Sequence, residues 1–174
     1  WTRPTEGGGG ISCVIQDSPV WEKGGCNVSV VFGTLTEKAA QEMAARGKDM
    51  LPGAKKFFAS GVSCVIHPRN PFCPTMHFNY RYFEITNDEG KKQAWFAGGQ
   101  DLTPYYVNEE DIRYFHGTLK AACDKHDATY YPKFKKWADD YFTITHRGET
   151  RGVGGVFFDD MNEKTEEAMY SFIS

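Results

Sequence analysis

The sequence predicts an α+β fold, because strand-like segments occupy most of its first half and helix-like segments follow them. Four or more strand-like segments come one after another with short connections, which favours an antiparallel sheet. The length of 174 residues is that of one ordinary domain. We therefore expect residues 1–174 to form a single domain around one core.

The first two strands are expected at Ile11 to Ile15 and at Asn27 to Gly33, and they should pair as neighbours. Asp17 to Pro19 and the pair Gly24-Gly25 lie between them and resemble turns.

A short helix is expected next. Thr34, followed three residues later by Glu37, fits a capping box, and Gly47 should end the helix. The apolar stripe of this helix consists of Ala40, Met43 and Ala44.

Three further strands are marked by β-branched and aromatic residues. They are expected at Phe57 to His67, Met76 to Thr86 and Lys92 to Ala97. Pro68 to Pro74 contains three prolines, which cannot continue a hydrogen-bonded ladder, so this link is expected to be an ordered loop. Asn87 to Gly90 is expected to be the hairpin turn before the last strand.

Helical spacing appears in Asn108 to Asp127, and Pro132 is expected to open a second helix. A strand at Val153 to Phe158 and a helix at Thr165 to Ile173 should follow. The apolar stripes of the two central helices are Ile112, Phe115, Leu119 and Cys123, and then Phe134, Trp137, Ala138 and Tyr141.

Composition excludes several classes of function. The net charge is −3, from 20 basic and 23 acidic residues, so the chain has no basic field for nucleic acid or an anionic membrane surface. No stretch approaches the ~18 apolar residues that a transmembrane helix needs. The five cysteines are odd in number and lack C-x-x-C spacing, which argues against a disulfide framework and favours a reducing compartment.

The most informative segment for function is Met76 to Glu84. Strand alternation places His77, Asn79 and Arg81 on one face, where they offer a proton-exchanging ring, an amide and a planar fork of donors. That combination suits an anionic substrate. A solvated sheet face is the competing interpretation. The opposite face of this strand carries Phe78, Tyr80 and Tyr82.

Ser63, Val65 and His67 share a face of the preceding strand, so Ser63 and His67 would flank the same cleft if the two strands pair. For His67 alone, a hydrogen-bonded position at a strand end is the simpler interpretation.

Two later segments add charged groups. Gly98-Gly99 is expected to end a strand and to present Asp101, either to a ligand or as a turn residue. Arg147 and Arg151 lie four residues apart in a glycine-rich segment, where they would clamp carboxylates or pair locally with Glu149.

Four of the histidines raise the alternative of a metal site, since imidazoles bind zinc, manganese or iron. The spacing contains no H-x-x-x-H or H-E-x-x-H motif, so no metal is the preferred prediction. The alternative set is His67, His77, His116 and His146.

Six segments, in order along the chain, resemble aerobic (oxygen-dependent) coproporphyrinogen III oxidases. Their order is more specific than any one of them. They are Gly7 to Gly10, Asn27 to Val31, His67 to Pro71, Pro74 to Glu84, Gly98 to Pro104 and Arg151 to Asp160.

The resemblance implies a broad antiparallel sheet flanked by helices on both faces, with the substrate in a cleft above the sheet. It implies oxidative decarboxylation of two propionates of coproporphyrinogen III, giving the vinyl groups of protoporphyrinogen IX, with dioxygen as co-substrate and no required cofactor. By the same resemblance His77 and Asp101 would be catalytic, and Ser63, Asn79, Tyr80 and Arg81 would bind substrate. Arg147 and Arg151 complete the predicted substrate-binding set, because local arginines suit a substrate with four propionates.

The resemblance also implies a homodimer, with Ser12 to Trp21 at its interface. A divalent metal on the four histidines is implied only for a bacterial branch of the family. Family members continue well past Ser174, so we expect this domain to be incomplete at its C-terminus. The expected location is the cytoplasm, or alternatively the mitochondrial intermembrane space.

Two other functions compete with this one. A non-catalytic tetrapyrrole-binding or dimerisation segment would bind substrate without turnover, and a metal-dependent hydrolase would lose its activity on chelation.

Overall fold

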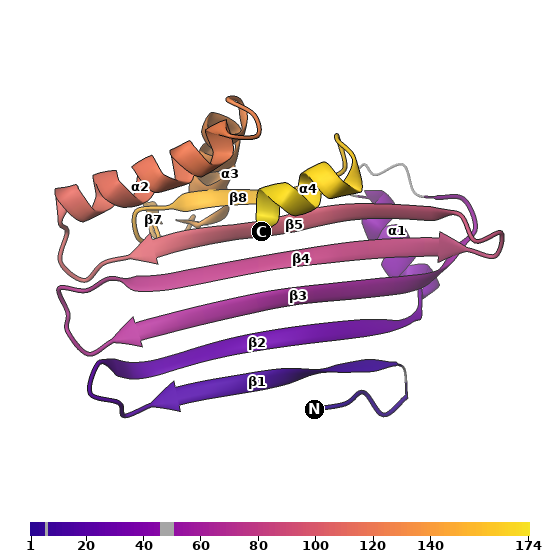
Figure 1. Cartoon of the computed structure of the whole chain (residues 1–174), viewed down its shortest axis with the longest axis horizontal. Helices are drawn as coiled ribbons and strands as arrows, with labels where there is room; N and C mark the ends of the chain where they lie inside the picture. The colour runs from indigo at the N-terminus through magenta and orange to yellow at the C-terminus, as the bar shows by residue number, and fades with distance from the viewer. Residues whose placement is uncertain (6, 46–50) are drawn as a thin grey trace.

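The computed structural model describes residues 1–5, 7–45 and 51–174. At its centre is a six-stranded antiparallel sheet in the order β1-β2-β3-β4-β5-β8 (Figure 1). A two-stranded hairpin, β6 and β7, stands apart from this sheet. The strands are β1 (Gly8–Gln16), β2 (Trp21–Thr34), β3 (Ala54–Pro68), β4 (Thr75–Asn87), β5 (Lys92–Thr103), β6 (Thr143–Ile144), β7 (Glu149–Thr150) and β8 (Gly155–Met161).

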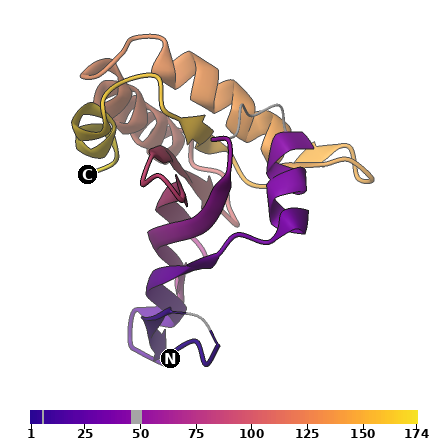
Figure 2. The same cartoon turned by 90° about the vertical axis from the view of Figure 1, so that its right-hand side faces the viewer.

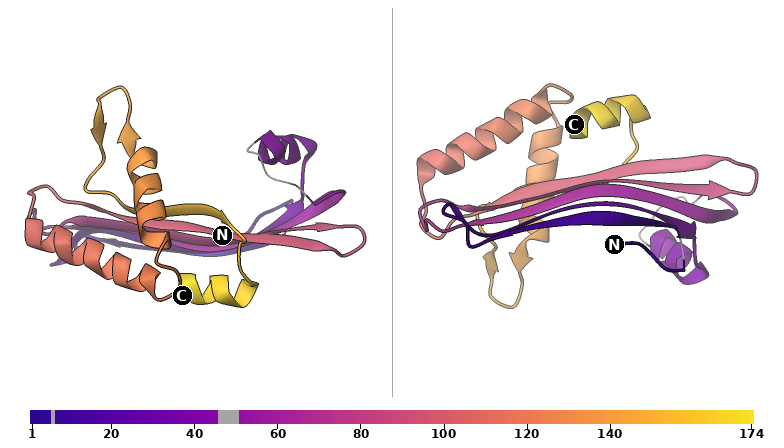
Figure 3. Two further views of the ribbon diagram at one scale, coloured as in Figure 1. Left: turned by 90° about the horizontal axis from the view of Figure 1, so that it is seen from above. Right: turned by 60° about the horizontal axis from the view of Figure 1, so that its bottom comes forward.

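Helices lie on both faces of the sheet, which confirms the predicted α+β architecture. Helices α2 and α4 cover one face, whereas α1 and the β6–β7 hairpin lie over the other (Figures 2 and 3). The helices are α1 (Glu37–Ala45), α2 (Glu109–Asp124), α3 (Tyr130–Tyr141) and α4 (Glu166–Ile173). None of the described helices is long and apolar enough to cross a membrane.

Two glycine pairs predicted to interrupt strands lie inside them instead. Gly24-Gly25 belongs to β2, and β5 continues through Gly98-Gly99 to Thr103. A Cβ on Gly98 would lie 2.4 Å from the Tyr80 ring, and one on Gly99 would lie 2.6 Å from the Val156 carbonyl oxygen. These two glycines therefore allow close packing against the neighbouring strands, and Asp101 is a strand residue rather than a turn residue.

The helix boundaries show a second difference. Thr36, not Thr34, caps α1, since its hydroxyl accepts a hydrogen bond from the Ala39 N–H while Thr34 is still in β2. The predicted end of this helix, Gly47, lies outside the described residues. Helix α3 begins at Tyr130, so Pro132 lies within its first turn instead of opening it.

The main core fills the space between the sheet and helices α2, α3 and α4. Phe134 of α3 and Phe158 of β8 are almost fully buried, with their rings 5.1 Å apart. The end of α3 reaches the other side of the sheet, where Tyr141 stacks on Phe157 at 4.1 Å. Alternate residues of β8 therefore face the core and the opposite face, and α3 passes the β8 edge to contact both.

Strands β1 to β3 extend beyond the three helices on the core side (Figure 1). On this side, Ile11, Val28 and Phe32 are exposed, and Ile11 retains 76% of its accessible surface. We call this area the helix-free patch.

Candidate functional site

The alternation of β4 places the predicted polar residues together, as the sequence indicated. His77, Asn79 and Arg81 lie on the sheet face opposite the main core, which we call the site face. Ser63 is the β3 partner of Asn79. Asp101 is the β5 partner of His77. Cross-strand pairing thus joins residues that lie far apart in the sequence.

Asp101 is the central buried charge of this face. Its side chain is 3% exposed, and its two oxygens lie 2.8 Å from His77 Nδ1 and 2.9 Å from an Arg151 nitrogen. Because each oxygen meets a different partner, the carboxylate fixes both side chains at once. An Nδ1–H donated to Asp101 would leave His77 Nε2 free to exchange a proton.

Arg151 reaches Asp101 because the loop between β7 and β8, which it begins, folds back over the end of β5. Gly152 has a φ of +60°, and a Cβ there would lie 2.3 Å from the Leu102 carbonyl oxygen. The Val153 N–H donates to the same carbonyl at 3.0 Å. The Arg151 guanidinium also lies 4.5 Å from the centre of the Phe142 ring, which holds it by a cation–π contact.

Arg81 has a carboxylate partner of its own on β8. Its guanidinium donates to Asp159 at 3.1 Å and remains half exposed. The β5–β8 pairing is irregular just after Asp159, where Asp160 takes a φ of +62°. This bulge keeps Asp159 on the site face while Met161 turns back into the core.

Three adjoining hollows lie along the site face. The largest has a volume of about 560 Å³, and His77 also lines the second, of about 280 Å³. Ser63, Asn79 and Arg81 line both the second and the third, of about 170 Å³. Shared residues therefore connect the three into one surface. The largest is lined by Val65, His67, Thr75, His77, Asp101, Thr103, Pro104, Tyr105 and Arg151.

Two residues expected at the site lie elsewhere. Tyr80 packs with Phe158 on the core side, as strand alternation requires, and burial raises the pKa of its phenol to about 12. Arg147 pairs with Glu149 at 2.9 Å in the β6–β7 hairpin and lines none of the described hollows. Arg147 thus makes the local Arg–Glu pair that the sequence offered as an alternative, whereas Arg151 lines the largest hollow.

The four histidines of the metal alternative do not gather. Only His67 and His77 line the largest hollow. His116 donates from Nε2 to the Val153 carbonyl at 3.0 Å and accepts at Nδ1 from the Tyr131 hydroxyl, also at 3.0 Å. In the described part of the chain, no three His, Cys, Asp or Glu side chains are placed to hold a metal ion.

Sequence reasoning missed several residues of this face. Asp159 was noted only as half of an acidic pair. Strand alternation would have placed it on the same face as Phe157, two residues earlier. Tyr141 and Phe142 reach the second hollow from the end of α3. No local signal shows that a helix end meets this surface.

Known proteins resemble this chain over its whole length. Residues 1–174 match the family model described as Coproporphyrinogen III oxidase. The oxygen-dependent coproporphyrinogen-III oxidase of Drosophila melanogaster is 62% identical, and the match covers 100% of this chain and 45% of that protein. The mitochondrial enzyme of Homo sapiens is 58% identical, with 99% and 38% covered. The chloroplastic enzyme of Glycine max is 54% identical, with 99% and 46% covered.

The chain thus spans less than half the length of these relatives. Its whole length nevertheless matches the family, and the identity to each of these enzymes exceeds half of the aligned residues. The chain belongs to the coproporphyrinogen III oxidase family.

Proposed function

We propose that this chain carries the substrate-binding and proton-handling face of an enzyme that oxidatively decarboxylates two propionates of coproporphyrinogen III, giving protoporphyrinogen IX. The observation that carries the proposal is the buried Asp101 carboxylate, which holds His77 and Arg151 at the floor of the largest hollow. The names of the similar enzymes support the reaction class.

Binding rests on Arg81 and Arg151, which lie at different hollows of the same face. Each is about half exposed, so each keeps donors for a second acceptor besides its own carboxylate. Two such guanidiniums suit a substrate with several propionates. The shared hollows are lined by residues of β2, β3, β4, β5 and β8, which suits a broad macrocycle rather than a small acid.

The chemistry follows from the electron count. Converting one propionate to a vinyl group and carbon dioxide removes two electrons, which reduce one dioxygen to hydrogen peroxide. The reduced pyrroles supply electrons themselves, so the proposed reaction needs no organic cofactor or metal. We assign to Asp101 the acceptance of pyrrole N–H groups and to His77 Nε2 the movement of a proton. Dioxygen adds to the deprotonated ring, and the resulting peroxide takes a proton from the propionate β-carbon and leaves the ring as hydrogen peroxide. Loss of carbon dioxide then forms the vinyl double bond and restores the pyrrole.

A homodimer is part of the proposal. β1 is an edge strand, and Thr2 pairs with Gly9 near its beginning. From Ile11 to Gln16 its outer edge has no partner strand among the described residues. An open strand edge pairs readily with another chain. This supports a subunit contact at Ser12 to Trp21.

The cellular compartment is a further part of the proposal. The human relative is named as mitochondrial and that of Glycine max as chloroplastic. We propose the cytoplasm or the mitochondrial intermembrane space for this protein, and fractionation with an antibody would distinguish the two.

The test of function uses a full-length enzyme carrying this segment. Coproporphyrinogen III is supplied with and without dioxygen, and released carbon dioxide and porphyrin fluorescence after oxidation are measured. We expect oxygen-dependent release of two carbon dioxide molecules per substrate. Binding without turnover would instead indicate a non-catalytic tetrapyrrole-binding protein, and no binding would refute the proposal.

A further inference from the structure

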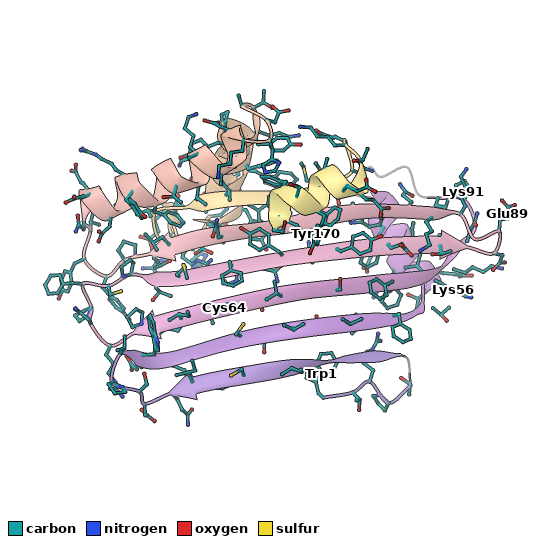
Figure 4. The ribbon with its side chains drawn as sticks, viewed as in Figure 1. Trp1, Lys56, Cys64, Glu89, Lys91 and Tyr170 are labelled. Carbon is teal, nitrogen blue, oxygen red and sulfur yellow. The ribbon has the colours of Figure 1, made fainter. Side chains whose placement is uncertain are left out.

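Three cysteines form a row across the helix-free patch. Cys13 of β1 is paired with Cys26 of β2, and Cys26 is paired with Cys64 of β3. The three thiols line a hollow of about 130 Å³, on the side of the sheet away from the proposed catalytic face. Figure 4 shows Cys64 on β3, well clear of the helices. The rest of this lining is Ile15, Trp21, Gly24, Gly25 and Ile66.

The hydrogen-bond pattern distinguishes the two pairs. Asp17 and Glu22 lie opposite each other at the end of the β1–β2 ladder. The Asp17 N–H donates to the Glu22 carbonyl, so these two residues are a hydrogen-bonded pair. Stepping by two residues along the unbroken register makes Cys13 and Cys26 a hydrogen-bonded pair as well. The Cα atoms of such a pair are typically ~5.5 Å apart.

Cys26 and Cys64, in contrast, are a non-hydrogen-bonded pair. The Leu35 N–H donates to the Lys55 carbonyl at the far end of the β2–β3 ladder, so every second pair from there is hydrogen-bonded and Cys26–Cys64 is not. Cα atoms of non-hydrogen-bonded pairs are only ~4.5 Å apart, and their side chains are closer. Cys26–Cys64 is therefore the closest thiol pair of the row, within the Cα range of disulfides.

The members of this pair differ in exposure. Cys26 is exposed, whereas Cys64 is buried. Burial, followed by the neighbouring Cys26, raises the pKa of the Cys64 thiol. An oxidant in solution therefore meets Cys26 first, and Cys64 is protected from direct attack but lies within reach of an oxidised neighbour.

We propose that Cys26 and Cys64 form a reversible intramolecular disulfide when a hydroperoxide oxidises the protein. The Cys26 sulfur attacks the peroxide oxygen, the O–O bond breaks, and Cys26 becomes a sulfenic acid while the peroxide leaves as water or an alcohol. The Cys64 sulfur then displaces the sulfenic hydroxyl, which leaves as water with the Cys64 proton. The two thiols lose two electrons in all, and the peroxide gains them.

This modification site is separate from the proposed active site but adjoins it through the backbone. Cys64 lies between Ser63 and Val65, which line hollows on the other face of β3. A disulfide would tie β2 to β3 directly behind those two residues. The proposal does not depend on the reaction assigned above, because any hydroperoxide supplies the same oxidation.

The experiment treats the reduced, folded protein with hydrogen peroxide, blocks the remaining thiols by alkylation, and identifies linked peptides by mass spectrometry. We expect one Cys26–Cys64 link, which dithiothreitol removes. The substitutions Cys26→Ser and Cys64→Ser should each abolish this link, whereas Cys13→Ser, in the same row, should leave its yield unchanged. Cys73→Ser is a control for an exposed loop thiol outside the row.

Three results would overturn the proposal: a Cys13–Cys26 link in place of Cys26–Cys64, links between chains only, or oxidation without any link. Circular dichroism before and after treatment shows whether the chain stays folded. If Cys64→Ser fails to fold, the wild-type and Cys13→Ser peptide maps still decide the outcome.

Discussion

The substitution Asp101→Asn tests the centre of the site, because it keeps the side-chain size and removes the charge. One Asp101 oxygen contacts His77 and the other contacts Arg151. An asparagine has one oxygen and one NH₂ group, so it can satisfy only one of these donors. If His77 carries its proton on Nδ1, one of the two donors would then face the asparagine NH₂ group at a buried position.

The expected loss follows from the burial of the three groups. A hydrogen bond to a charged group contributes about 1.5–3 kcal/mol, and breaking a fully buried ion pair costs about 3–5 kcal/mol. Here only the carboxylate is buried, whereas His77 is 38% exposed and Arg151 is 48% exposed, so water reaches both partners. We therefore expect a loss of about 2 kcal/mol, which lowers the Tm of a chain of this size by about 4–8 °C.

Thermal unfolding of Asp101→Asn, Arg151→Gln and the double variant measures this coupling directly. We expect the sum of the two single losses in unfolding free energy to exceed the loss of the double variant by about 1 kcal/mol or more. In a full-length enzyme carrying the segment, Asp101→Asn should also lower kcat/KM by roughly 10²- to 10⁴-fold, as for loss of a proton-handling group. Additive losses in stability together with unchanged turnover would refute the assigned geometry.

Arg81→Ala in the full-length enzyme should lower kcat/KM roughly ten- to a hundredfold at nearly unchanged Tm. The control Arg113→Ala, on α2, should leave kcat/KM unchanged. Equal effects of the two substitutions on kcat/KM would refute the role of Arg81. Burial alone would raise the pKa of Glu84, but hydrogen bonds from Lys92 and Tyr82 hold it below its usual 4.5. The ionised Glu84 therefore contributes its full stabilisation above pH 4.5, and this stabilisation is lost as the pH falls through the lower pKa of the folded protein. The Tm difference between wild type and Glu84→Gln should thus shrink in acid. A Glu109→Gln control should show little difference at any pH, since that carboxylate is exposed. Exhaustive chelation should leave the full-length enzyme fully active, and loss of activity restored by one divalent ion would contradict the proposed metal-free reaction.

The sequence predicted the parts of this molecule that depend on local periodicity. Alternation along β4 placed His77, Asn79 and Arg81 on one face, and that face carries the hollows. The same alternation placed Tyr80 on the other side, where it packs against the core. Its position is thus confirmed, and its contact with substrate stays a prediction.

Features that depend on pairing between distant segments could not be predicted. Gly98-Gly99 looked like a strand end because the strands they pack against are not visible locally. Arg147 and Arg151 share one glycine-rich segment, yet one pairs within a hairpin and the other meets Asp101 fifty residues earlier in the chain. Register and loop direction decide such contacts, and neither follows from spacing along the sequence.

The most direct test of the central claim is a crystal structure of the full-length enzyme with coproporphyrin III, the oxidised form of the proposed substrate. We predict that the macrocycle lies over β3, β4 and β5 on the site face, with His77 beneath it and propionates within hydrogen-bond distance of Arg81 and Arg151. A macrocycle bound on the helix-covered face or on the helix-free patch would contradict this account.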